Sequence, residues 1–153
     1  MNDLLAAQLP ELMRHLPGFQ LYCFCFIILL LKVMFVSTLT GRVRLRVKVS
    51  LNPEDAAIGT QAADTEHPEV ARVQRAHRND VENIPLFLLL GLLATLAGVP
   101  LLGLRILFIT FTLARLVHTI TYLRGLQPWR TLSFALGQVS CGVLLVLLFI
   151  RIL

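Results

Sequence analysis

Charged residues are scarce in this chain: they make up only 15% of its 153 residues, whereas 56% are apolar. The mean hydropathy is also positive, and this combination is typical of a membrane protein rather than of a soluble domain. The few charges still sum to +5. Nucleic-acid binding is not indicated, because the cations stand in short groups beside apolar runs, as the cytoplasmic flanks of membrane spans do.

Cysteine is rare as well. The three cysteines, Cys23, Cys25 and Cys141, all lie inside apolar runs. Such positions are typical of buried free thiols, so the sequence predicts neither a disulfide framework nor a metal site.

Three largely apolar segments are long enough to cross a bilayer, and the apolar part of a further one, from Ile84 to about Ala97, is short, so the polar stretch before it is expected to continue the same helix outward. No small-residue cleavage site follows the first segment, so we interpret it as a retained span rather than a signal peptide. Neither an internal repeat nor a separate domain is visible. We therefore predict an all-α integral membrane protein, a single four-helix bundle over residues 1–153, with spans at about 16–40, 72–97, 101–123 and 131–153.

Positive charge is unevenly distributed among the loops. Seven Lys and Arg residues fall between 41 and 82, none in the turn at 98–100, and two between 124 and 130. Cytoplasmic loops carry such an excess, so both termini are expected to face away from the cytoplasm. Residues 41–48 alternate cations with apolar residues, which is compatible with a strand, but four cations directly after a span are the usual cytoplasmic signal.

The most densely polar stretch, residues 75–83, comes directly before the apolar part of the second span. In a helix, one face would carry two cations, an amide and a carboxylate at i, i+3, i+4 and i+7: Arg75, Arg78, Asn79 and Glu82. His77 and Asp80 would share a different face. Guanidinium groups bind carboxylates in a fork and Glu82 can accept from an ammonium group, so this face suits a small ligand with carboxylates and an amine. A solvated, salt-bridged helix start is the alternative.

A second polar face is predicted in the third span, where Arg115, His118 and Tyr122 are spaced i, i+3 and i+7. Polar side chains inside a bilayer are costly unless they face a bundle interior or a wet cavity, so this face is a candidate for function. A satisfied hydrogen-bond network between helices is the alternative. Lys32 is costly in the same way. Two roles are considered for it: its side chain snorkels to the membrane surface, or it pairs with an inward carboxylate.

Four sequence blocks are distinctive in order and spacing: TGRVRLRVK at 40–48, NPEDA at 52–56, RAHRNDVEN at 75–83 and ARLVHTITYL at 114–123. Together they resemble the family of membrane-associated proteins in eicosanoid and glutathione metabolism (MAPEG), over nearly the whole chain. The resemblance implies a homotrimer in the endoplasmic reticulum or a related membrane. It also implies that glutathione binds between adjacent subunits, near the cytoplasmic face.

The resemblance carries over to single residues where the motifs match. The implied glutathione contacts are Arg44, Arg75, Arg78, Asn79, Glu82, His118, Tyr122 and Arg130. Catalytic roles are implied for Arg130 as the cation that favours the thiolate, for Thr131 as a hydroxyl donor to sulfur, and for Asp55 of the NPEDA block as a base.

Within the family, the sequence resembles two branches at once. Arg130-Thr131 stands where the prostaglandin E synthase branch has an Arg-Ser pair, and residues 138–141 resemble its fourth span, but Phe134 replaces its tyrosine. Residues 82–84, 127–128 and 132–134 instead resemble the microsomal glutathione transferases. The predicted function is transfer of glutathione to a lipophilic electrophile, of the transferase or peroxidase type. The alternatives are isomerisation of the endoperoxide prostaglandin H2 and a non-catalytic lipid-binding scaffold, which would not need the arginine face.

Overall fold

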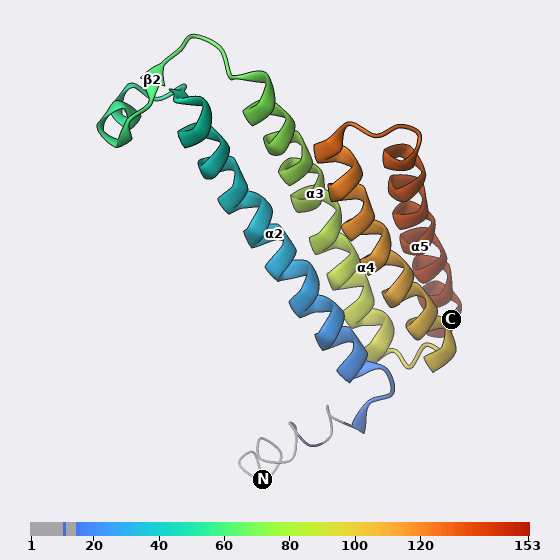
Figure 1. Cartoon of the computed structure of the whole chain (residues 1–153). Coiled ribbons are helices and arrows are strands. Elements are labelled where there is room, and N and C mark those ends of the chain that lie inside the picture. Colours follow the sequence, from blue (N-terminus) through green and yellow to red (C-terminus); the bar gives the residue numbers. More distant parts are fainter. Residues whose placement is uncertain (1–10, 12–14) are drawn as a thin grey trace.

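The computed structural model describes residue 11 and residues 15–153 (Figure 1). Within these residues, four helices are long and apolar enough to cross a membrane. They are α2 (Phe19–Val47), α3 (Pro68–Leu96), α4 (Leu101–Arg124) and α5 (Trp129–Ile152). The chain runs up and down through the bundle, so that the start of α2 and the C-terminus lie at one end and the loops 48–67 and 125–128 at the other (Figure 1). The predicted four-helix membrane protein is confirmed.

Two helices extend past the predicted spans at the end where these two loops lie. α2 continues to Val47, so residues 41–47 of the alternating stretch are helical and do not form a strand, and Lys48 caps the end of the helix. α3 begins at Pro68, a residue suited to the first turn because its missing N–H would be unpaired there anyway. Each helix has 29 residues and is therefore about 44 Å long. The hydrocarbon core is only about 30 Å thick, so both helices reach beyond it.

The loop between α2 and α3 is compact. It contains the short strands β1 (Val49–Ser50) and β2 (Gln61–Ala62), which pair in parallel, and the 3-10 helix η1 (Pro53–Ile58) between them. The NPEDA block falls largely within η1. The Asp55 carboxylate accepts hydrogen bonds from the Ser50 hydroxyl and from the Asn52 amide within this loop.

An aromatic cluster fills the bundle core between α3 and α4. The rings of Phe87 and Phe111 stack nearly parallel with centroids 3.6 Å apart, and Phe108 meets Phe87 edge to face at 5.9 Å. α4 is the most buried of the four helices, whereas α2 and α5 expose many large apolar side chains, as helices that face lipid do. α4 is packed against neighbouring helices, and several of its polar residues, including Arg115, His118 and Thr119, are buried among them.

Candidate functional site

A charged cluster lies buried where α2, α3 and α4 meet. The Asp80 side chain is 0% exposed and pairs with Lys32 Nζ at 2.5 Å and with Arg115 Nη2 at 2.8 Å. The hydroxyl of Thr119 donates to the other carboxylate oxygen at 3.3 Å. Of the two roles considered for Lys32, the structure supports pairing with an inward carboxylate. Asp80 itself was not predicted as a site residue, although a lone lysine in an apolar run signals the need for such a partner.

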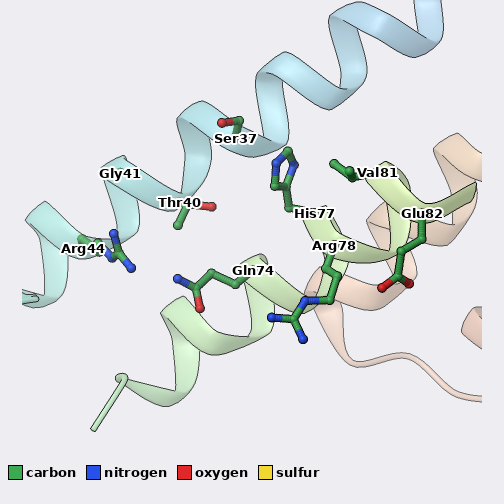
Figure 2. Close-up of a pocket in the computed structure, with 9 residues that line it drawn as sticks. All are labelled: Ser37, Thr40, Gly41, Arg44, Gln74, His77, Arg78, Val81 and Glu82. Carbon is green, nitrogen blue, oxygen red and sulfur yellow. The ribbon is translucent and has the colours of Figure 1, made fainter. Parts of the chain in front are cut away.

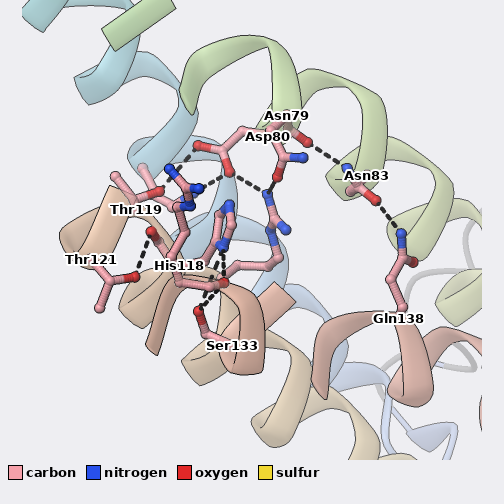
Figure 3. Close-up of polar contacts among 11 residues, drawn as sticks. Asn79, Asp80, Asn83, His118, Thr119, Thr121, Ser133 and Gln138 are labelled. Carbon is pink, nitrogen blue, oxygen red and sulfur yellow. Dashed lines mark hydrogen bonds and ion pairs between the residues drawn. The ribbon is translucent and has the colours of Figure 1, made fainter. Parts of the chain in front are cut away.

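Hydrogen bonds extend from this cluster to α5 (Figure 3). Arg115 donates to the side-chain oxygen of Asn79 at 2.5 Å. The Asn83 amide donates to the Asn79 backbone carbonyl at 2.7 Å, and Gln138 donates to Asn83 at 2.9 Å. For Arg115 the structure therefore agrees with the alternative of a hydrogen-bonded network between helices. Asn79 is fixed by this network at the edge of a cavity.

That cavity, here named the Arg130 pocket, lies between α3, α4 and α5 and has a volume of about 250 Å³. The guanidinium carbon of Arg130 lies 4.9 Å from the centre of the Tyr122 ring, a distance typical of cation–π contact. The ring of Phe134 lies 5.8 Å from that of His118. Five of the six lining residues were predicted from the sequence to act in one site: the pocket is lined by Asn79, His118, Tyr122, Arg130, Thr131 and Phe134.

His118 links the wall of the Arg130 pocket to the backbone of α5. Its Nδ1 atom lies 3.0 Å from the carbonyl oxygen of Arg130, and the Ser133 hydroxyl lies 3.5 Å from the same nitrogen. The other ring nitrogen, Nε2, is buried and has no hydrogen-bond partner in the part of the chain that the structure describes. A buried polar atom without a partner costs free energy, so a ligand that supplies the missing hydrogen bond would be favoured here.

A second cavity, named the α2–α3 groove, has a volume of about 590 Å³ and opens between these two helices (Figure 2). Figure 2 shows Arg44 on α2 across from Gln74, His77 and Arg78 on α3. Three of the predicted glutathione contacts, Arg44, Arg78 and Glu82, belong to it. The full lining is Ser37, Thr40, Gly41, Arg44, Gln74, His77, Arg78, Val81 and Glu82.

Arg44 in the α2–α3 groove already holds a carboxylate. Its Nη2 atom pairs with Glu66 Oε2 at 2.9 Å, and Gln74 donates to the same oxygen at 2.9 Å. Arg44 Nε and Glu66 Oε1 are buried and have no partners among the described residues. The recorded contact with Glu66 uses one Arg44 nitrogen, so a ligand carboxylate can bind the remaining N–H groups of the guanidinium beside Glu66, a residue that the sequence analysis did not single out.

The structure does not gather all predicted site residues into one cavity of a single chain. The α2–α3 groove and the Arg130 pocket divide most of them. Arg75 is exposed on α3 and lines neither cavity, and Asp55 lies in the loop that follows α2.

A bundle of four apolar helices with a buried ion cluster and polar cavities between its helices defines a multi-pass membrane protein that can hold a small polar ligand. The chain belongs to the MAPEG family, whose sequence profile matches residues 22–150. This confirms the predicted family.

Similar proteins carry two kinds of name. The chain is 43% identical to prostaglandin E synthase from Bos taurus over 114 residues, which cover 72% of this chain and 74% of that protein. It is 42% identical to microsomal glutathione S-transferase 1 from Sus scrofa over 137 residues, 86% of this chain and 88% of the relative. Prostaglandin E synthase from Homo sapiens is 37% identical over 135 residues, with the same coverage. Both names denote enzymes, in agreement with the prediction of an enzyme.

Proposed function

We propose that this protein is a glutathione-dependent membrane enzyme that activates the glutathione thiol and transfers it to a lipophilic electrophile. The observation that carries the proposal is the Arg130 pocket, where Arg130, Tyr122, Thr131 and His118 line one cavity. Its chemistry suits a thiol, because a nearby cation favours the thiolate, the nucleophilic form.

Arg130 and Thr131 of the Arg130 pocket have distinct parts in this proposal. Bound glutathione gives its thiol proton to solvent, and the thiolate forms a thioether with an electrophilic carbon of a substrate dissolved in the membrane. The bond from that carbon to its leaving group, such as chloride, breaks, and the leaving group departs as an anion. The Arg130 guanidinium stabilises negative charge on sulfur, and the Thr131 hydroxyl donates a hydrogen bond to it. Both residues stand in the first turn of α5, where the positive end of the helix dipole adds to the same field.

In this proposal, the charged side chains of α3 bind the carboxylates and the ammonium group of glutathione. Arg75, Arg78 and Glu82 are exposed on a helix that crosses the membrane, and charged side chains are costly against lipid. A second copy of the chain would cover them, so we include the homotrimer, with glutathione between subunits, in the proposal. The arginines then bind the carboxylates and Glu82 accepts from the ammonium group.

Replacing Arg78 by alanine should weaken glutathione binding by well over tenfold, because losing one partner of a buried charged pair costs on the order of 2 to 5 kcal/mol. Isothermal titration calorimetry on the purified protein measures this. Arg42→Ala is the matched control, since Arg42 is an exposed arginine on α2 that lines neither cavity. Equal affinity in both variants would contradict glutathione binding at the polar face of α3 and would support the alternative of a solvated, salt-bridged helix surface.

We also propose that the protein resides in the endoplasmic reticulum or another intracellular membrane, with the loops 48–67 and 125–128 in the cytoplasm. In sealed microsomes, protease should cut within residues 48–67 and leave tags at both termini intact. This follows from the excess of cations near that loop. Opening the microsomes with detergent is the control and should remove both tags. Loss of the N-terminal tag in sealed microsomes would invert the proposed orientation.

Prostaglandin E synthesis is the second candidate, favoured by the hydroxyl of Thr131 beside Arg130 and by relatives of that name. Phe134 lacks a hydroxyl, and Asp55, the base implied for this reaction, is held within its loop by Ser50 and Asn52. Purified protein with glutathione should be given a chlorodinitrobenzene-type electrophile and, separately, prostaglandin H2. Thioether formation supports the first candidate and isomerisation the second, whereas inactivity on both without glutathione binding favours a lipid-binding scaffold.

A further inference from the structure

The side chain of Gln127 contacts both residues to which the proposed function assigns the thiol chemistry. Its amide oxygen accepts from Arg130 Nε at 3.2 Å and from Arg130 Nη2 at 2.7 Å. Its amide nitrogen donates to the Thr131 hydroxyl oxygen at 3.0 Å. In the reverse orientation the Thr131 hydroxyl would donate to the amide oxygen at 3.0 Å, but the amide hydrogens would face the guanidinium, donor against donor. We therefore assign the amide the first orientation.

Arg130 is thereby held on two sides without losing its charge. The amide oxygen bridges two of its N–H groups, and the ring of Tyr122 lies 4.9 Å from the guanidinium carbon. Among the described residues, no carboxylate pairs with Arg130. A neutral amide fixes a guanidinium as a carboxylate would, but it leaves the full positive charge free to act on an anion.

The same amide also sets the direction of the Thr131 proton. A hydroxyl has one hydrogen to donate and two lone pairs. Since Thr131 accepts from Gln127, its own hydrogen remains available for another acceptor. Thr131 lines the Arg130 pocket, so an anion bound there can receive that hydrogen bond.

We propose that Gln127 is a positioning residue of thiol activation, which fixes the Arg130 guanidinium and frees the Thr131 proton for the sulfur anion. This inference rests on the proposed function and adds to it a residue outside the pocket lining. Gln127 is exposed in the loop between α4 and α5, so its replacement removes no packing from the bundle core.

The test is a pH titration of the ultraviolet thiolate absorbance of bound glutathione, with glutathione affinity measured in parallel. Gln127→Glu keeps the shape but places a carboxylate against Arg130, so the thiolate midpoint should rise by about 1 to 3 pH units. Gln127→Ala should raise the midpoint less and lower turnover, with affinity within a few-fold of wild type in both variants. Arg124→Gln, at the end of α4 beside this loop, changes the net charge by the same amount as Gln127→Glu and should leave the midpoint unchanged.

Two other outcomes are decisive. If wild type forms the thiolate and both Gln127 variants titrate with the wild-type midpoint, the positioning role is overturned and the proposed function stands. If wild-type protein binds no glutathione or forms no thiolate, the proposed function fails and the inference fails with it. If Arg124→Gln raised the midpoint as much as Gln127→Glu, the shift would be due to net charge near the loop and not to contact with Arg130. That result would also overturn the inference.

Discussion

Replacing Asp80 by leucine should lower the free energy of unfolding by about 3 to 5 kcal/mol. The carboxylate is fully buried between Lys32 and Arg115, so its loss leaves two cations inside the bundle without a counterion. Such a cost is a large fraction of the total stability of a small domain. Equilibrium unfolding of the purified protein in mixed micelles with a denaturing detergent measures the change.

An exposed ion pair of the same protein gives the matched control. Arg46 and Glu69 pair at the ends of α2 and α3 with side chains 67% and 54% exposed, and Glu69→Gln should cost less than about 1 kcal/mol. Adding Lys32→Met to Asp80→Leu should restore part of the lost stability, because one of the stranded cations is then gone. Similar losses in Asp80→Leu and Glu69→Gln would contradict the buried cluster.

Replacing Arg130 by leucine should lower turnover by about 2 to 4 kcal/mol of transition-state stabilisation, the scale of one electrostatic donor. Glutathione affinity should stay within a few-fold, because in the proposed function the tripeptide's own charges bind to α3 and not to Arg130. The thiolate absorbance at neutral pH should shrink along with turnover. Steady-state kinetics, calorimetry and ultraviolet spectra on the same preparation separate these effects.

Arg124→Leu controls for the loss of a cation from the same loop. Arg124 is exposed at the end of α4 and lines neither cavity, so its variant should keep both turnover and thiolate. An Arg130→Leu protein that also keeps both would make Arg130 a flanking cation of the membrane span. Thiol activation would then have to be sought at Tyr122 or Arg78.

Hydropathy was enough to predict four membrane-spanning helices, because three apolar runs are long enough to cross the bilayer and the shorter second run continues into the polar stretch of the same helix. It was not enough to place the end of α2. The alternating cations at 41–48 fit a helix because Arg44 and Arg46 find carboxylates at Glu66 and Glu69. These partners follow some twenty residues later, and a local pattern does not contain them.

Helical spacing predicted which site residues share a face, but not how the helices are rotated. Asn79 and Asp80 are neighbours about 100° apart around α3; one lines the Arg130 pocket and the other is buried against Lys32. In α4, His118 and Tyr122 line that pocket whereas Arg115 joins the ion cluster. The contacts of Glu66 and Gln127 depend on loop conformation, which their sequence neighbours do not specify.

A carbonyl oxygen can only accept a hydrogen bond, so His118 Nδ1 must carry the ring proton that it donates to Arg130. In this tautomer the neutral ring presents a lone pair at Nε2. A group that binds there must bring its own hydrogen, as an amide or a thiol does, whereas an ionised carboxylate is repelled. In the proposed function, this histidine would favour an orientation of glutathione that turns a peptide N–H toward His118 and the carboxylates toward the arginines of α3.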